Sequence, residues 1–153
     1  MKIENRLEEI GIELPPPVKP VANYVTTVQT GNLVFTSGHG PVNMSGELEK
    51  GQLGTDMTIE EGYQSARLVG LGLISTLKDI LGDLDRIKRV IKVVGFVNST
   101  PDFLDHPKVV NGVSDLFVEV FGDKGKHARS AVGMVQLPGG IPVEVEVIVE
   151  IED

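Results

Sequence analysis

Two residues near the C-terminus have side chains that suit chemistry on a small acid. Arg129 carries a guanidinium, a planar fork of N–H donors that matches a carboxylate in a bidentate way. Glu144 carries a carboxylate that could polarise a water molecule or move a proton. Each residue also has a plainer interpretation. Arg129 could be a surface arginine at the end of a strand, and Glu144 one of several solvated glutamates on a strand face.

The segment that holds both residues predicts a β-hairpin. Small and apolar residues over 130–135 and alternating valine and glutamate over 143–152 indicate two strands, and Pro-Gly-Gly at 138–140 is a turn signal. In such a hairpin Arg129 lies opposite Glu150, and Glu144 lies about six residues further along, roughly 20 Å at strand rise. A pocket that uses both residues therefore requires a second copy of the chain.

A glycine-rich loop follows the second predicted strand. Ser37, Gly38, His39 and Gly40 could offer backbone N–H and C=O groups to a ligand, because glycine allows close approach to the main chain. Ordinary turn geometry explains the same glycines. The loop is thus a second candidate for a binding element.

The histidines give no indication of a metal centre. His39, His106 and His127 are scattered without the spacing of a zinc site, and the chain has no cysteine to join them. There is no phosphate-binding loop of the Walker type and no Gly-x-Ser-x-Gly nucleophile motif. We therefore expect no metal in the site.

The elements that position these residues can be read from periodicity and from glycine stops. Helical stripes and β-branched runs define six segments besides the C-terminal hairpin: helices over 3–10, 58–82 and 107–122, and strands over 23–28, 32–37 and 87–99. This order predicts an α+β fold, a two-layer sandwich in which a mixed β-sheet carries two helices on one face. We expect a single domain over 1–153, with residues 1–19 as an N-terminal helical arm and proline-rich connector.

The second face of the predicted sheet needs a cover. The strand over 87–99 is apolar on both faces in its middle, and it would share this face with the glutamates of the last strand. Such a face is too apolar for open water. We infer oligomerisation, with sheet faces meeting around a closed symmetry axis.

Composition narrows the class of protein. The chain has 153 residues and a formal net charge of −8, which argues against a general nucleic-acid binder, because phosphate neutralisation needs clustered lysine and arginine. No apolar run is long enough to span a membrane, and residues 1–6 lack the apolar core of a signal peptide. A cytoplasmic location is the resulting expectation.

Several separate motifs, in a consistent order, carry a resemblance to a known family. They are Asn23-Tyr24, the segment 31–38 with Pro41, Val110-Asn111 leading into Phe117, the segment 128–132, Leu137-Pro138 and the segment 143–146. On these motifs the chain, from about residue 20 to its end, resembles the Rid family of enamine/imine deaminases, also called the YjgF family.

The resemblance implies a chorismate-mutase-like fold, a homotrimer, and pockets in the clefts between subunits. It implies hydrolysis of 2-imino and 2-enamino acids to 2-keto acids and ammonia with no metal and no organic cofactor. Arg129 matches the residue that holds the substrate carboxylate, and Glu144 matches the glutamate near the water. The substrate-binding set that follows is Tyr24, Ser37, Gly38, His39, Asn111 and Ala131. Asn111 could instead decorate an exposed helix face.

The chain departs from the family pattern in places that bear on substrate choice. His39 stands where the deaminases often have glutamine, Ala131 where cysteine is frequent, and Ser114 where tyrosine is frequent. One alternative is therefore a non-catalytic module whose arginine captures a 2-keto acid. Another is an endoribonuclease, against which the acidic net charge speaks. A chorismate mutase rests on fold analogy only.

Overall fold

The computed structural model describes residues 2–20 and 23–152. Its regular elements follow the predicted order: α1 (Lys2–Glu9), β1 (Thr27–Thr30), β2 (Leu33–Thr36), α2 (Ile59–Leu81), β3 (Ile87–Asn98), α3 (His106–Phe121), β4 (Ala128–Met134) and β5 (Val143–Ile151). Short 3-10 turns cover Leu84–Arg86, Gly122–Gly125 and Pro138–Gly140. No helix in this described part of the chain combines the length and the apolar character needed to cross a bilayer.

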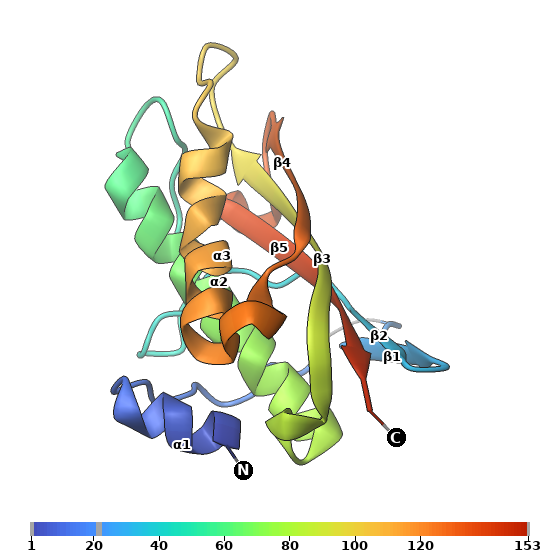
Figure 1. Cartoon of the computed structure of the whole chain (residues 1–153). Helices are drawn as coiled ribbons and strands as arrows, with labels where there is room; N and C mark the ends of the chain where they lie inside the picture. Colours follow the sequence, from blue (N-terminus) through green and yellow to red (C-terminus); the bar gives the residue numbers. More distant parts are fainter. Residues whose placement is uncertain (1, 21–22, 153) are drawn as a thin grey trace.

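The five strands form one mixed sheet in the order β1-β2-β5-β3-β4. β3 and β4 are parallel, and the other neighbouring pairs are antiparallel. The helices α2 and α3 contact each other and lie together on one face of this sheet (Figure 1). The predicted α+β sandwich, with a mixed sheet and two core helices on one face, is confirmed.

The predicted C-terminal hairpin is wrong. β4 and β5 do not pair with each other, because β3 lies between them and pairs with both. Arg129 lies beside Val93 of β3, while Glu150 pairs with Arg89 and with Leu33 of β2. The physical reason is the crossover through α3, which returns β4 parallel to β3 on its free edge. The chain then passes the end of β3 through residues 135–142 before β5 inserts.

Local signals in the sequence set the ends of the long helix correctly. Thr58 and Glu61 form a reciprocal capping box, in which each side chain accepts from the other residue's backbone N–H. Gly82 ends the helix with φ 77°, a conformation that favours glycine. The apolar stripe of α2 and that of α3 then bury the inward side chains of β3 and β5, including Val93 and Val147.

The N-terminal arm packs on the helical layer. Leu7 of α1 is buried, and α1 contacts α3 and the turn at Leu84–Arg86. The Asp85 carboxylate accepts from the backbone N–H groups of Lys2 and Ile3 and so caps the first turn of α1. Further along the arm, the Ser75 hydroxyl of α2 donates to the Pro15 carbonyl. The arm is thereby tied to the sandwich at both of its parts.

The open face of the sheet is partly apolar. Val28, Phe35 and Ile148 lie side by side across β1, β2 and β5, and Val28 is 58% exposed while Phe35 is 39% exposed. Phe96 and Val132 extend this face on β3 and β4, with Val132 40% exposed. These exposures are the observation expected of a face that packs on another subunit. The trimer itself stays a prediction.

Two helical glycines give a matched test of the α2–α3 packing. A methyl group at Gly112 of α3 would lie 2.1 Å from the Tyr63 carbonyl oxygen of α2, which is main chain and cannot turn aside. We expect Gly112→Ala to lower the free energy of unfolding by about 2 kcal/mol or more, as overpacked cores do. Denaturant unfolding followed by circular dichroism measures it.

The control is Gly72→Ala in α2, where an added methyl would meet only a His39 ring carbon at 4.0 Å. Here the better helix propensity of alanine should raise stability by up to about 1 kcal/mol. Equal effects of the two substitutions would contradict the close helix contact at Gly112.

Candidate functional site

Arg129 is held by two side chains of α3. Its Nη1 group donates to Asn111 Oδ1 at 2.8 Å and to Ser114 Oγ at 3.1 Å. Asn111 and Ser114 stand three residues apart, which places them on the same helix face. Because Nη1 carries two hydrogens, these two bonds use both of them. The Nε and Nη2 hydrogens, which form the other side of the guanidinium, remain available to a ligand.

No acidic residue pairs with this guanidinium within residues 2–20 and 23–152. Arg129 is nevertheless only partly exposed, in a shallow hollow lined also by Ser114, Val118, Lys126 and His127. Buried or half-buried cations usually have an anionic partner, since desolvation of a lone charge is costly. Within the described part of the chain, Arg129 is thus a cation whose fork meets no carboxylate, which suits an external one.

Ser114 and His127 belong to this cluster, although we did not predict that either residue holds Arg129. Ser114 Oγ lies 2.9 Å from His127 Nε2, and His127 Nδ1 lies 2.6 Å from the Gly125 carbonyl oxygen. Burial lowers the pKa of the His127 imidazole below its ordinary value; the bond to the Gly125 carbonyl opposes this, and the charge of Arg129 adds to it. The three-residue spacing of Asn111 and Ser114 indicates that both side chains lie on one helix face. It does not predict a contact with Arg129, because that depends on where β4 lies relative to α3.

A second cluster surrounds Glu144 on β5. A methyl group added at Gly38 would lie 2.5 Å from Glu144 Oε2, so the glycine of the loop and the carboxylate are in close contact. Burial raises the pKa of the Glu144 carboxyl above its ordinary value, and the charge of Glu146 on the same strand face raises it further. Glu144 is therefore a half-buried carboxyl group with a heightened affinity for a proton, as acid–base groups require.

Ser37, just before Gly38, is bonded to the segment that precedes β1. Ser37 donates its hydroxyl to the Val25 carbonyl at 2.6 Å and its backbone N–H to the Thr26 carbonyl at 2.8 Å. Tyr24 is 51% exposed and lines a hollow of about 210 Å³ together with Ser37 and Gly38. The predicted residues Tyr24, Ser37 and Gly38 are thus brought together in one place.

His39 turns its ring away from this hollow. The side chain is 4% exposed, with Nδ1 2.8 Å from the Ser37 carbonyl oxygen and Nε2 2.8 Å from Thr76 Oγ1 of α2. Its backbone pairs with Val145 of β5. Burial lowers its pKa, which favours the neutral ring. His39 therefore borders the hollow through its main chain, while its imidazole joins the loop to the helical layer.

The two clusters lie on opposite faces of the sheet. Arg129 is level with Val93, whose side chain is buried under the helices, and Ala131 shares the Arg129 face of β4 beside Gly95. Glu144 is level with Phe96 on the open face. From the register, Arg129 and Glu144 are two strands and three residues apart, about 14 Å between main chains. Arg129 and Glu144 of one chain therefore cannot contact the same small ligand. We reached this conclusion from the predicted hairpin, which is wrong, but the observed register supports it.

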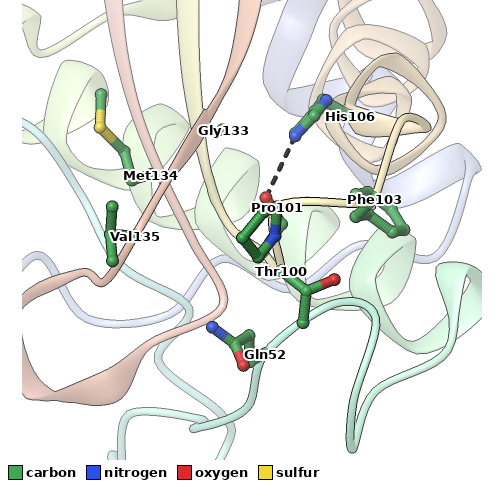
Figure 2. Close-up of a pocket in the computed structure, with 9 residues that line it drawn as sticks. Gln52, Thr100, Pro101, Phe103, His106, Gly133, Met134 and Val135 are labelled. Carbon is green, nitrogen blue, oxygen red and sulfur yellow. Dashed lines mark hydrogen bonds between the residues drawn. The ribbon is translucent and has the colours of Figure 1, made fainter.

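Another hollow, at the end of β3 and β4, contains none of the predicted residues (Figure 2). It has a volume of about 480 Å³ and is lined by Gln52, Ser99, Thr100, Pro101, Phe103, His106, Gly133, Met134 and Val135. Figure 2 shows Met134 and Val135 on one side and His106, bonded to Ser99 at 3.1 Å, on the other. No arginine, lysine or carboxylate lines it, so it offers no charge to recognise an acid.

Three carboxylates approach one another elsewhere, at Glu4, Asp83 and Asp85. Each accepts backbone N–H groups: Glu4 from Leu84, Asp83 from Asp85, and Asp85 from the start of α1. Such bonds are what caps of helical turns make. Their position therefore has a structural explanation, remote from Arg129 and Glu144.

Comparison with known proteins places the chain among relatives of this fold. Residues 4–148 match the family model described as "YjgF/chorismate mutase-like, putative endoribonuclease". A Trypanosoma cruzi protein called TCP17 is 44% identical over 153 residues, covering 99% of this chain and 96% of that protein. A 2-iminobutanoate/2-iminopropanoate deaminase of Dermatophagoides farinae is 28% identical over 142 residues, covering 92% and 95%.

A crystal structure from Shewanella oneidensis MR-1, of a protein described as a "putative endoribonuclease", superposes with a TM-score of 0.93 at 36% identity. The match covers 97% of this chain and 99% of that one. The shared fold therefore extends over the N-terminal arm as well as the sandwich.

The contact between Gly38 and Glu144 gives a direct test of the second cluster. In Gly38→Ala the new methyl must displace the Glu144 carboxylate, which is the end of a flexible side chain and can move without unfolding the loop. We expect the displaced carboxyl to be less buried, so that its NMR titration midpoint falls toward the ordinary glutamate value.

The matched control is Gly40→Ala, whose methyl would meet Leu48 and Ile141 and no carboxylate. It should leave the titration of Glu144 unchanged. An unchanged Glu144 midpoint in Gly38→Ala would show that the carboxylate does not rest on the loop.

Proposed function

The chain belongs to the YjgF/chorismate mutase-like family, and on that basis we propose that it is a hydrolytic deaminase of small 2-imino and 2-enamino acids. The products would be a 2-keto acid and ammonia, and no cofactor would take part. The observation that carries this proposal is the guanidinium fork of Arg129, which is fixed by Asn111 and Ser114 and has no carboxylate partner among the residues that the structure describes.

Arg129 would hold the substrate by its carboxylate. The Nε and Nη2 hydrogens point in parallel and match the two oxygens of a planar carboxylate. Since Nη1 is already bonded to α3, the guanidinium loses little further freedom when a ligand binds. A small 2-imino acid held in this way has its C=N carbon at a fixed distance from the protein, which is most of what the reaction needs.

Glu144 would handle the water. Water adds to the C=N carbon and its two protons pass in turn to the nitrogen, so that the C–N bond breaks, ammonia departs and the C–O bond becomes the keto group. A carboxylate with a raised pKa is suited to accept the first proton and return it to nitrogen. Gly38 would let the substrate approach the main chain beside this carboxylate, with Ser37 and Tyr24 completing the wall.

A closed site would need two copies of the chain. Arg129 faces the helical layer of one subunit, and Glu144 faces outward from the open side of the sheet. Packing of open faces around a threefold axis would cover Phe35 and Val132 and would bring the Arg129 edge of one subunit toward the Glu144 hollow of the next. We therefore include the homotrimer with intersubunit clefts in the proposal.

A second candidate is a binding module that captures a 2-keto acid without turnover. The observation that favours it is the commitment of the His39 ring to bonds with Ser37 and Thr76, which makes this imidazole unavailable as an acid–base partner of Glu144. An endoribonuclease is a third candidate because relatives carry that name, but the net charge of −8 opposes RNA binding. RNA cleavage that survives Arg129→Ala and repeated purification would support it.

Removal of the guanidinium tests the carboxylate role. With imines generated in situ by an amino-acid oxidase, we expect Arg129→Ala to lower kcat/KM by about 100-fold, in line with loss of a charged bidentate contact. Arg129→Lys keeps the charge but loses the fork, so its kcat/KM should lie between those of the wild type and Arg129→Ala. Arg89→Ala, which removes a surface arginine paired with Glu150 at 3.0 Å, is the control and should change kcat/KM little.

Two outcomes separate the candidates. Binding of pyruvate to the wild type without turnover, lost in Arg129→Ala, supports the module over the enzyme. Full turnover by Arg129→Ala removes the basis of both.

The pH dependence of turnover tests Glu144. Because its pKa is raised, the carboxylate becomes protonated early as the pH falls, so kcat should decline through that pKa on the acidic side and level off above it. Glu144→Gln should lower kcat at least 100-fold and remove this acidic limb.

The control for this experiment is Glu146→Gln, which removes the neighbouring charge that raises the pKa of Glu144. It should keep activity and move the acidic limb to lower pH. An acidic limb that persists unchanged in Glu144→Gln would assign the titration to another group.

A further inference from the structure

We propose that His127 is a positioning residue for ligand binding: through Ser114 it holds the Arg129 guanidinium in the orientation that leaves its Nε and Nη2 side open to a carboxylate. This inference rests on the proposed carboxylate role of Arg129. It assigns a purpose to two residues, Ser114 and His127, that are neither ligand-binding nor acid–base groups in the proposed reaction.

The hydrogen bonds around Ser114 have a single consistent direction. A carbonyl oxygen can only accept, so His127 Nδ1 carries a hydrogen and donates it to Gly125. In the neutral ring Nε2 then has only a lone pair and must accept from the Ser114 hydroxyl. With its proton directed to His127, Ser114 Oγ turns its lone pairs toward Arg129 Nη1 and accepts from it.

The imidazole at the end of this chain of bonds is itself well fixed. Its ring stands edge-on to Phe117 of α3, with ring centroids 6.0 Å apart at 78°. The Gly125 residue that accepts from Nδ1 is buried, and a methyl group there would lie 2.2 Å from the Phe117 carbonyl oxygen, so this turn sits directly on α3. His127 therefore gives Ser114 an acceptor whose place is set by the main chain.

The surroundings of the ring favour the neutral form that this arrangement needs. The charged groups around it are mainly basic: Arg129 on β4, Arg89 on β3, which borders a surface hollow with His127, and Lys126 before it. Arg89 is paired with Glu150, and Lys126 with Asp123 at 3.1 Å. Burial already lowers the pKa of the ring, and no carboxylate bonded to it among the described residues reverses this.

Loss of the acceptor would release one of the two bonds that orient Arg129. Without Nε2 the Ser114 hydroxyl can rotate and direct its own proton toward Nη1, where two donors would face each other. Asn111 alone would then hold the guanidinium, which could turn about that single bond. Ligand affinity should fall because the fork must be ordered on binding, while the reacting atoms of a bound substrate are untouched.

The test compares His127→Phe, which keeps a ring against Phe117 but has no acceptor, with His127→Gln, whose amide oxygen can still accept from Ser114. Three quantities are measured for each: KM and kcat for an imine generated in situ, and the Kd of pyruvate by calorimetry. We expect His127→Phe to raise KM and Kd about 5- to 10-fold with kcat within twofold of wild type, the size of one weakened bond to a charged group. His127→Gln should stay within twofold in all three.

Ser114→Ala completes the test as a double-mutant cycle. It should raise KM and Kd by a similar factor, and the double variant Ser114→Ala with His127→Phe should be no worse than either single variant, since both act through the same bond to Arg129. Thermal melting confirms that each variant is folded.

The outcomes separate this inference from the proposed function. If the wild type is active and His127→Phe leaves KM and Kd unchanged, the role of His127 is overturned but the role of Arg129 is not. The same holds if the effects of Ser114→Ala and His127→Phe multiply in the double variant. A wild-type protein that neither turns over imines nor binds pyruvate overturns the carboxylate role of Arg129, and this inference with it.

Discussion

The parallel pairing of β3 with β4 is the constraint on which the candidate site depends. The chain leaves β3, crosses the helical face as α3 and returns beside β3, so the first residues of β4 come to lie under the middle of α3. Arg129 is in this place, and Asn111 and Ser114 reach it from the helix. The hairpin of β4 with β5 that the sequence indicated would have placed the same arginine opposite Glu150, within reach of a carboxylate. The topology of one crossover therefore decides whether the cation is paired internally or left for a ligand.

The sheet separates two kinds of environment. On its helical face the cation is surrounded by hydroxyl, amide and imidazole groups, with no anion bonded to it among the residues described. On its open face two glutamates lie next to each other, and their repulsion together with burial makes Glu144 hold a proton more tightly. Arg129 and Glu144 lie two strands and three residues apart on these opposite faces, so they do not form an ion pair within one chain. Their separation within a chain preserves an unpaired positive charge and a basic carboxylate at the same time.

Local features of this fold could be predicted from the sequence, and long-range pairing could not. The ends of α2 follow from Thr58, Glu61 and Gly82, and the buried face of β5 follows from its alternation of valine with glutamate. The partner of β5 does not, because period-two patterns are the same for every neighbour that a strand could have. For the same reason the sequence alone indicated that Arg129 and Glu144 were candidates but missed that Ser114 and His127 belong beside the arginine. The direction of the His39 ring depends on Thr76 of α2, a contact that no local pattern announces.

The tight crossing of the two long helices has a consequence for the neighbouring amide. Gly112, where the backbone of α3 lies close to that of α2, is adjacent in sequence to Asn111. The distance of the Asn111 side-chain amide from the sheet therefore depends on how closely α3 packs against α2. The hydrogen bonds that orient Arg129 come from α3, and α2 supports them indirectly by setting the position of α3. Substitutions in the core between α2 and α3, far from the ligand, would therefore change the affinity of the protein for a carboxylate.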